Sequence, residues 1–248
     1  MKPNRLVLFD IDGTLLSVDR QAWDFPASLC QAILEVLVEN SVPHDEKNIR
    51  SNAGKYQPSG KTDPQIVFEF LEGTGISETE IFRLMPVFRD KYIVLLGDAV
   101  RSPVNVQLKP GISRLLQRLS EKEEVVLALL TGNFEEGALL KLESHGLQKY
   151  FVFEVSAFGD DSRQRQELPG RAVESAREHL GRDFTGKSVV ILGDTPNDVR
   201  CGRDLNARSI AVATGHYSVE ELAAENPDFT FRDFSETENV LPAILNPL

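Results

Sequence analysis

Apolar residues occur along this chain in short runs, and the stretches between the later runs have helical periodicity. Runs that are apolar at nearly every position are typical of parallel strands buried on both faces. They lie at residues 6–9, 125–130, 151–155, 189–192 and 210–212, with a weaker edge candidate at 229–231. Helical spacing follows at 112–119, 139–147, 172–180 and, more weakly, 219–224. This alternation predicts an α/β fold, a doubly wound parallel sheet with helices on both faces.

The interval between the first two runs has a different pattern. Residues 23–39, 65–72 and 78–96 carry apolar side chains at the i, i+3, i+4 spacing of amphipathic helices. Ser77, followed by Glu80, has the pattern of a capping box that would start the third helix. The sequence therefore predicts two domains. A Rossmann-like core is made of residues 1–16 and 106–248, and a smaller α-helical cap, residues 17–105, is inserted into it.

The composition narrows the compartment and the partners. Of the 248 residues, 41% are hydrophobic and 26% are charged, and the formal net charge is −11. Such an acidic chain is repelled by nucleic acids and by anionic membranes. The longest apolar run, at 125–130, is far shorter than the roughly 20 residues that span a bilayer. The N-terminus lacks a secretory pattern, and neither Cys30 nor Cys201 has metal-binding spacing. We expect a cytoplasmic protein.

Acidic side chains follow two of the predicted strands. Asp10 and Asp12 close the first strand, with Gly13 available for a sharp turn beside a ligand, and Asp194 and Asp198 follow the fourth. Because ligands bind at the carboxyl edge of open parallel sheets, these carboxylates are expected to meet there. They suit a hard divalent cation, a nucleophile or acid–base chemistry. The alternatives are a simple turn for the first pair and a helix cap for Asp198.

A third predicted strand end adds groups that could bind an anion. Thr131, Gly132 and Asn133 follow the run at 125–130 and offer a hydroxyl group and the N–H groups of a small backbone turn. Three strands thus deliver polar groups to one edge of the sheet, which makes chance clustering a poor explanation.

These residues resemble the motifs of the haloacid dehalogenase superfamily. Residues 10–14 (DIDGT) are similar to its first motif, Thr131 to its second and residues 193–198 (GDTPND) to its fourth. The position of the helical insertion resembles the subgroup of phosphoglycolate phosphatases and β-phosphoglucomutases. The third motif is normally a lysine, and the matching region contains none. We expect Arg165 to replace it, with Arg163 as the alternative, although both could be solvated loop arginines.

The resemblance implies a mechanism. Asp10 would attack phosphorus and form an aspartyl-phosphate, and Asp12 would act as general acid and then as general base. Mg²⁺ would be held by Asp10, by the backbone carbonyl of Asp12 and by Asp194, with Asp198 as an outer or occasional ligand. The phosphoryl oxygens would be bound by Thr131, Gly132, Asn133 and Arg165. Because dehalogenases with this core lack a carboxylate at the position of Asp12, its presence favours phosphoryl transfer.

The resemblance also points to the loop at residues 59–63 (SGKTD) as the part of the cap that closes over the leaving group. Lys61 and Asp63 are then candidates for substrate specificity, with a surface turn as the alternative. A nucleotide-binding P-loop is disfavoured, because five residues (55 to 59) separate Gly54 from Gly60 instead of four and no buried strand precedes them.

The expected function is that of a Mg²⁺-dependent phosphatase acting on a small phosphorylated metabolite, similar to phosphoglycolate phosphatase. A monomer and a homodimer both fit the sequence. Three alternatives stay open. They are a phosphomutase of the β-phosphoglucomutase type, a phosphonate hydrolase that uses Lys61 or Lys55 as a Schiff base, and a non-catalytic phosphate-binding module.

Overall fold

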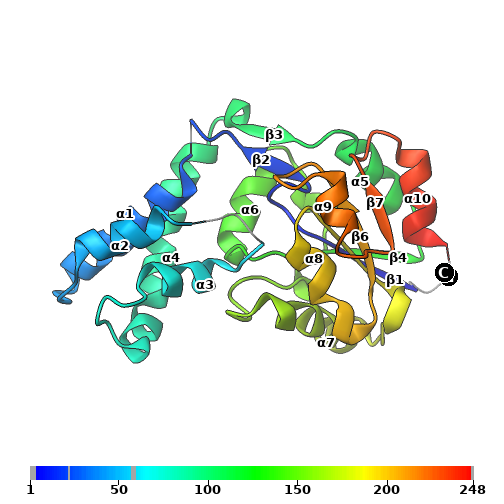
Figure 1. Ribbon diagram of the computed structural model, residues 1–248. Helices are drawn as coiled ribbons and strands as arrows, with labels where there is room; N and C mark the ends of the chain where they lie inside the picture. The colour runs from blue at the N-terminus through cyan, green and yellow to red at the C-terminus, as the bar shows by residue number, and fades with distance from the viewer. Residues whose placement is uncertain (1–3, 22, 57–59, 247–248) are drawn as a thin grey trace.

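A computed structural model describes residues 4–21, 23–56 and 60–246 (Figure 1). Five parallel strands form the central sheet in the order β4-β1-β5-β6-β7. Their bounds are β1 (Arg5–Phe9), β4 (Val125–Leu129), β5 (Val189–Gly193), β6 (Arg208–Val212) and β7 (Phe229–Phe231). After β1 the chain adds β4 on one side and later β5 on the other. The strand order thus reverses beside β1, which is where open α/β sheets form a ligand-binding crevice.

Helices cover both faces of this sheet, as the sequence predicts for the α/β class. On one face, Val7 and Phe9 of β1 pack in a cluster with the buried leucines of α5 (Ile112–Ser120) and with α10 (Thr237–Leu245). On the other face, Leu6 and Leu8 pack with buried residues of α7 (Leu168–Leu180). The remaining helices of this part are α6 (Glu135–Glu143), α8 (Pro196–Cys201) and α9 (Val219–Ala223). Alternate side chains of one strand therefore belong to two separate cores.

Four helices between residues 25 and 100 form a unit that we call the helical insert. They are α1 (Phe25–Glu39), α2 (Glu46–Ala53), α3 (Asp63–Phe70) and α4 (Glu78–Val100). The insert is flanked by β2 (Leu16–Val18) and β3 (Val106–Leu108), which pair antiparallel, so the chain leaves and returns at one place. Figure 1 shows the insert beside the sheet, with α6 next to it. Tyr92 of α4 contacts Phe134 at the start of α6, with ring centroids 6.2 Å apart.

One predicted strand is wrong. Within residues 151–155, Phe153–Val155 form a 3-10 turn. The segment still runs beside β4, since the Val152 and Ala157 N–H groups donate to the carbonyls of Leu127 and Leu129, both at 2.9 Å. Between these two anchors the backbone bonds to itself, with Val155 N–H donating to the Val152 carbonyl. The apolar pattern therefore reflects burial of the segment in the core, not a continuous strand.

The other elements differ from the predictions mainly at their ends. The helix predicted at 139–147 is α6, which begins four residues earlier, and α2 and α10 are helices that the pattern does not predict. Further 3-10 turns lie at Pro103–Asn105, Gln148–Tyr150, Arg165–Glu167, Gly186–Ser188 and Arg203–Leu205. The side chain of Ser77 accepts the Glu80 N–H at 3.2 Å and caps α4, which is one half of the predicted capping box, whereas the Glu80 carboxylate accepts hydrogen bonds from Arg83.

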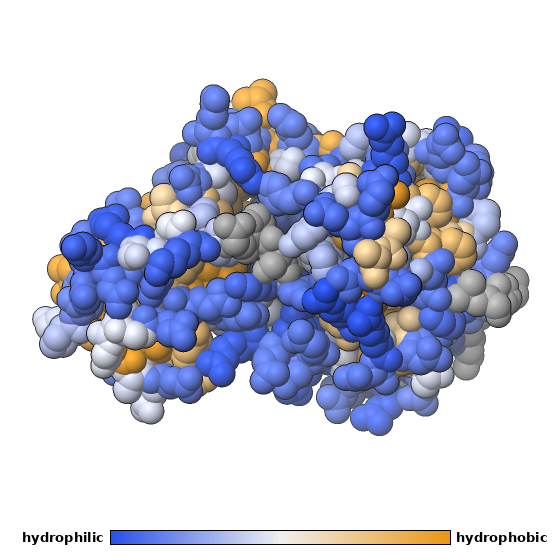
Figure 2. Space-filling model, in the orientation of Figure 1, coloured by the Kyte–Doolittle hydropathy of each residue, from blue (hydrophilic) through white to orange (hydrophobic). Residues whose placement is uncertain are grey.

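The face of the molecule seen in Figure 2 is mostly polar. Hydrophilic residues predominate over both the insert and the sheet domain, with small apolar areas scattered among them. Within the described ranges, no helix combines the length and the apolar character needed to cross a bilayer.

Candidate active site

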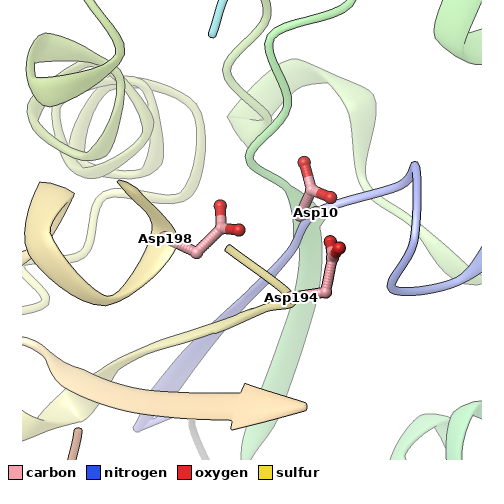
Figure 3. A group of neighbouring side chains, drawn as sticks. All are labelled: Asp10, Asp194 and Asp198. Atoms are coloured by element: carbon pink, nitrogen blue, oxygen red, sulfur yellow. The ribbon is translucent and has the colours of Figure 1, made fainter. Parts of the chain in front are cut away.

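Three aspartates meet at the carboxyl edge of the sheet (Figure 3). Asp10 follows β1, Asp194 follows β5, and Asp198 lies on α8. Carboxylate oxygens of the three side chains lie within 4.8 Å of one another, and all three residues are buried. The register of the sheet brings the first two together, because the Asp10 N–H continues the ladder to the Leu192 carbonyl at 2.9 Å.

A tight turn after β1 positions Asp194. Gly13 has φ +92°, and a Cβ at this residue would overlap the Asp194 carboxylate. A Cβ at Gly215 would overlap the same carboxylate. Thr14 Oγ1 donates to Asp194 Oδ1 at 3.2 Å. The glycines therefore leave room for the acidic side chain, which a hydroxyl from the same turn holds in place.

The aspartates repel one another in a dry environment. The pKa of Asp10 is raised to about 7, because burial and the charges of Asp198 and Asp12 together raise it by more than the Arg165 guanidinium lowers it. Burial, and then the carboxylates of Asp10 and Asp198, also hold the pKa of Asp194 well above its ordinary value. A divalent cation would relieve this repulsion. Carboxylate oxygens are the donors that Mg²⁺ prefers, so the residues present fit such an ion.

Asp198 is held more completely than its two neighbours. Its Oδ1 accepts a hydrogen bond from Arg165, and its Oδ2 accepts the Thr195 N–H at 2.9 Å and the Thr195 hydroxyl at 2.7 Å. The N-cap residue of α8 is Thr195, and Asp198, at the third helical position, completes a capping box with it. The alternative prediction of a helix cap for Asp198 therefore holds in part, because Asp198 helps to cap α8 from the third helical position while Thr195 is the N-cap residue.

Arg165 lies within the carboxylate cluster, whereas Arg163 does not. The Arg165 side chain is 2% exposed, and its Nη2 donates to Asp10 Oδ1 at 2.9 Å as well as to Asp198. Burial alone lowers the pKa of Arg165, but Asp198 and Asp10 raise it by more, so the guanidinium stays charged. The Arg163 side chain is 38% exposed, and its guanidinium lies 4.4 Å from the centroid of the Phe68 ring.

The turn after β4 links the cluster to Asp12. Thr131 is fully buried, and its Oγ1 accepts Asn133 Nδ2–H at 2.7 Å. The same amide nitrogen donates to Asp12 Oδ2 at 2.7 Å. The Gly132 carbonyl accepts the Asp63 N–H of the insert at 2.7 Å. Thr131, Gly132 and Asn133 therefore connect the sheet edge both to Asp12 and to the insert.

A buried lysine that the sequence analysis does not single out completes this group. Lys141 lies on α6 and is 3% exposed. Its Nζ donates to Asp12 Oδ2 at 2.7 Å and to Asn133 Oδ1 at 2.6 Å. A signal was present in the sequence, because Lys141 shares the apolar face of its helix with Ala138 and Leu142. A lysine on such a face is buried with a partner, and carboxylates are its usual partners.

A cavity of about 870 Å³ opens from this edge toward the insert. Its walls include Asp10, Asp12 and Lys141 on the sheet side, and Phe25 and Tyr56 of the insert on the other side, together with Trp23 just before the insert. Asp63 and Lys61 also line it. The side chain of Lys61 is paired with Glu69 of the same insert at 2.7 Å.

Asp63 has a different environment from Lys61. It is 5% exposed, and its Oδ2 accepts the Phe134 N–H at 3.0 Å. Burial raises the pKa of Asp63 to about 7, although Lys141 opposes the shift. The Asp63 carboxylate therefore fastens the insert to the sheet domain. Lys55, the other lysine considered for a Schiff base, is exposed and does not line the cavity.

Known proteins resemble this chain across almost its whole length. The haloacid dehalogenase-like hydrolase family matches residues 4–206. A protein of Dickeya dadantii named "Probable phosphatase IndB" is 27% identical over 246 residues, which cover 99% of this chain and 96% of the relative. A phosphoglycolate phosphatase of Agrobacterium fabrum is 27% identical over 243 residues, which cover 98% of this chain and 93% of that protein.

Solved structures agree on the fold. A β-phosphoglucomutase from Clostridium difficile superimposes with a TM-score of 0.64 at 15% identity, covering 98% of this chain and 97% of that chain. A hydrolase from Pseudomonas syringae superimposes with a TM-score of 0.60 at 20% identity, covering 97% of this chain and 98% of that hydrolase. At these identities the likeness concerns architecture alone, whereas the family match spans most of the sequence. The chain is therefore an enzyme of the haloacid dehalogenase-like hydrolase family.

Proposed function

We propose that this enzyme is a Mg²⁺-dependent phosphatase that hydrolyses a small phosphorylated metabolite through an aspartyl-phosphate on Asp10. The observation that carries the proposal is the surroundings of Asp10. It is a buried carboxylate at a strand end, held by Arg165, close to Asp194 and facing a cavity that Asp12 also lines. The names of the relatives support phosphoester hydrolysis, since one is called a phosphatase and another a phosphoglycolate phosphatase.

Asp10 acts as the nucleophile. Arg165 donates to Oδ1 of Asp10. None of the described residues donates to Oδ2, so Oδ2 is the oxygen that attacks phosphorus. The bond from phosphorus to Asp10 Oδ2 forms as the bond to the leaving-group oxygen breaks. Asp12 protonates that oxygen, and later takes a proton from the water that hydrolyses the aspartyl-phosphate. Thr131, Gly132, Asn133 and Arg165 bind the phosphoryl oxygens.

The carboxylate cluster would hold Mg²⁺ through Asp10, the backbone carbonyl of Asp12 and Asp194. Asp198 would act as an outer ligand, because both of its carboxylate oxygens already accept hydrogen bonds from Arg165 and Thr195. When bound, the cation neutralises the repulsion between an anionic nucleophile and a phosphate dianion.

Residues 17–105 would act as a cap that closes over the leaving group, with Lys61 and Asp63 on its inner side. The cavity volume of about 870 Å³ suits a small molecule. Both cysteines, Cys30 and Cys201, are free thiols, which supports work in a reducing compartment such as the cytoplasm. We expect a monomer or a homodimer and a substrate similar to phosphoglycolate.

The test is phosphate release from a panel of small phosphoesters, with Mg²⁺ and with chelator, for the native enzyme and for Asp10→Asn. We expect metal-dependent turnover that Asp10→Asn lowers by at least about 1000-fold, because the nucleophile is lost. Asp204→Asn is the control, since Asp204 is exposed and precedes β6 at the opposite edge of the sheet. Full turnover by Asp10→Asn would contradict the assignment of the nucleophile.

Two other outcomes would redirect the proposal. A reaction that requires a sugar bisphosphate and releases no net phosphate would indicate a phosphomutase, the activity by which the C. difficile structure is named. Binding of Mg²⁺ and phosphate without turnover of any ester would indicate a binding module that keeps the site without its chemistry.

A further inference from the structure

We propose that Lys141 is a positioning residue that aims the Asp12 carboxylate at the leaving group, so that Asp12 protonates it from Oδ1. The inference rests on the proposed function and names a residue outside the motifs on which that proposal depends. Its basis is the set of hydrogen bonds that Lys141, Asn133 and Asp12 make with one another.

The three side chains form a closed triangle. Lys141 Nζ donates to Asp12 Oδ2 at 2.7 Å and to Asn133 Oδ1 at 2.6 Å. Asn133 Nδ2 donates to the same Asp12 Oδ2 at 2.7 Å. The lysine therefore fixes Asp12 directly, and it also fixes which end of the Asn133 amide faces Asp12, because Nζ requires the amide oxygen.

Both donors of the triangle bind one oxygen of Asp12. Among the residues that the structure describes, none donates to Oδ1. A carboxyl group whose Oδ2 accepts from an ammonium and an amide carries its acidic proton on the other oxygen. The Asp12 side chain is 46% exposed and lines the cavity, so Oδ1 is free to meet a leaving group.

Lys141 is much more deeply buried than its partner Asp12. Its side chain is 4% exposed, whereas that of Asp12 is 46% exposed. Without the lysine, Asp12 would keep a single neutral donor, Asn133, and could rotate in its partly open surroundings. A buried ammonium needs acceptors, and this one has two, both in the site. Lys141 is therefore placed to orient Asp12, because both acceptors of its ammonium group lie in the site.

The chemistry predicts which substrates need this orientation. As the bond from phosphorus to the leaving oxygen breaks, the proton of Asp12 Oδ1 passes to that oxygen and the bonding electrons stay on it. An alkyl leaving group requires this proton because an alkoxide is a strong base, whereas 4-nitrophenolate is stable enough to leave without it. Loss of Lys141 should therefore slow alkyl esters selectively.

The experiment compares kcat/KM of Lys141→Met for two substrates, 2-phosphoglycolate (or the alkyl phosphate that the panel ranks first) and 4-nitrophenyl phosphate. This constant covers the steps up to departure of the leaving group, and the ratio of the two values does not depend on how much of the variant is folded. We expect a fall of about 100-fold for the alkyl ester and of less than about threefold for the aryl ester.

Two further variants test whether Lys141 acts through Asp12. In an Asp12→Asn background, Lys141→Met should not change the ratio of kcat/KM for the alkyl ester to kcat/KM for the aryl ester any further, because the proton donor is already absent. Lys187→Met is the matched control. It removes another lysine–aspartate pair, to Asp228 at 2.7 Å, outside the cavity lining, and it should leave the ratio unchanged.

Equal losses for both esters with Lys141→Met, or none, would overturn the proposal. If Lys141→Met yields no folded protein, Lys141→Arg keeps a charged donor, and it should lower the ratio by a smaller factor; an unchanged ratio would again overturn it. The proposed function fails differently, since the native enzyme would then release no phosphate from either ester or Asp10→Asn would keep full turnover.

Discussion

The two walls of the cavity hold their charged groups in different ways. On the sheet side, Arg165 reaches Asp10 and Asp198, which lie on separate elements far apart in the sequence. On the insert side, Lys61 is paired with Glu69, eight residues away, and its side chain is 24% exposed. Charges that are buried and joined across elements keep a fixed geometry, whereas a locally paired, half-open lysine can move. The sheet wall therefore has the fixed geometry that the proposed chemistry requires, and the insert wall has the freedom that the proposed closure over the leaving group requires.

Asp63 is the exception on the insert side. Its backbone N–H and its carboxylate both contact the turn at residues 132–134 of the sheet domain. Thr62 Oγ1 adds a third link, donating to the Arg163 carbonyl at 2.7 Å. One short segment of the insert thus adopts the buried, cross-element bonding of the opposite wall.

The largest effect is expected from removing the buried cation of the sheet wall. Arg165→Met leaves Asp10 and Asp198 buried without their counter-charge, so the free energy of unfolding should fall by about 4 kcal/mol. Thermal or urea unfolding measures it. Arg163→Met is the matched control. Its loss should stay below about 1 kcal/mol, because Arg163 is partly exposed and its ion pair with Glu78 is 3.5 Å long. Equal losses of unfolding free energy in the two variants would show that Arg165 does not stabilise the protein by neutralising Asp10 and Asp198.

The buried carboxyl group of Asp63 makes the stability of the protein depend on pH. Burial raises its folded-state pKa from 3.8 to about 7, so the folded protein binds more protons than the unfolded chain between these values. Stability from this residue is therefore complete below about pH 4 and is lost as the pH rises to about 7. Without metal, Asp63→Asn should reduce the drop in unfolding free energy between about pH 5 and about pH 8 by on the order of 2–3 kcal/mol.

Chemical unfolding at these two pH values, run side by side on the native protein and the variant, measures the difference. Asparagine keeps an oxygen that can accept the Phe134 N–H, so the hydrogen bond need not be lost. An unchanged pH dependence would mean that Asp63 is ionised in the folded protein.

The smallest expected effect belongs to Lys61. Its pair with Glu69 is half-open, so Lys61→Ala should lower the unfolding free energy by less than about 1 kcal/mol. On the substrate panel, its effect should fall on KM and differ between leaving groups. A loss of kcat that is the same for every ester would place Lys61 in the chemistry and erase the distinction between the two walls.

The sequence was most informative where chemistry follows a strand. Asp10 and Asp194 could be placed at one sheet edge because parallel strands end on the same side, and the register fixes their proximity. It was least informative where burial imitates a strand, as at residues 151–155, and where a helix carries few apolar residues. Helix α2 is an example, since only Ile49 and Ala53 of its residues are buried.

Periodicity and neighbouring residues are enough to predict the α/β class, the strand ends and the aspartates that follow them. Tertiary packing, in contrast, places Arg165 and not Arg163 in the cluster, and it brings Lys141 to Asp12 across 129 positions of the chain. Arg165 lies on a 3-10 turn and Lys141 on α6, and a long basic side chain can reach more than one carboxylate from either. Which one it meets depends on how that element packs against the sheet, and the local sequence does not specify that packing.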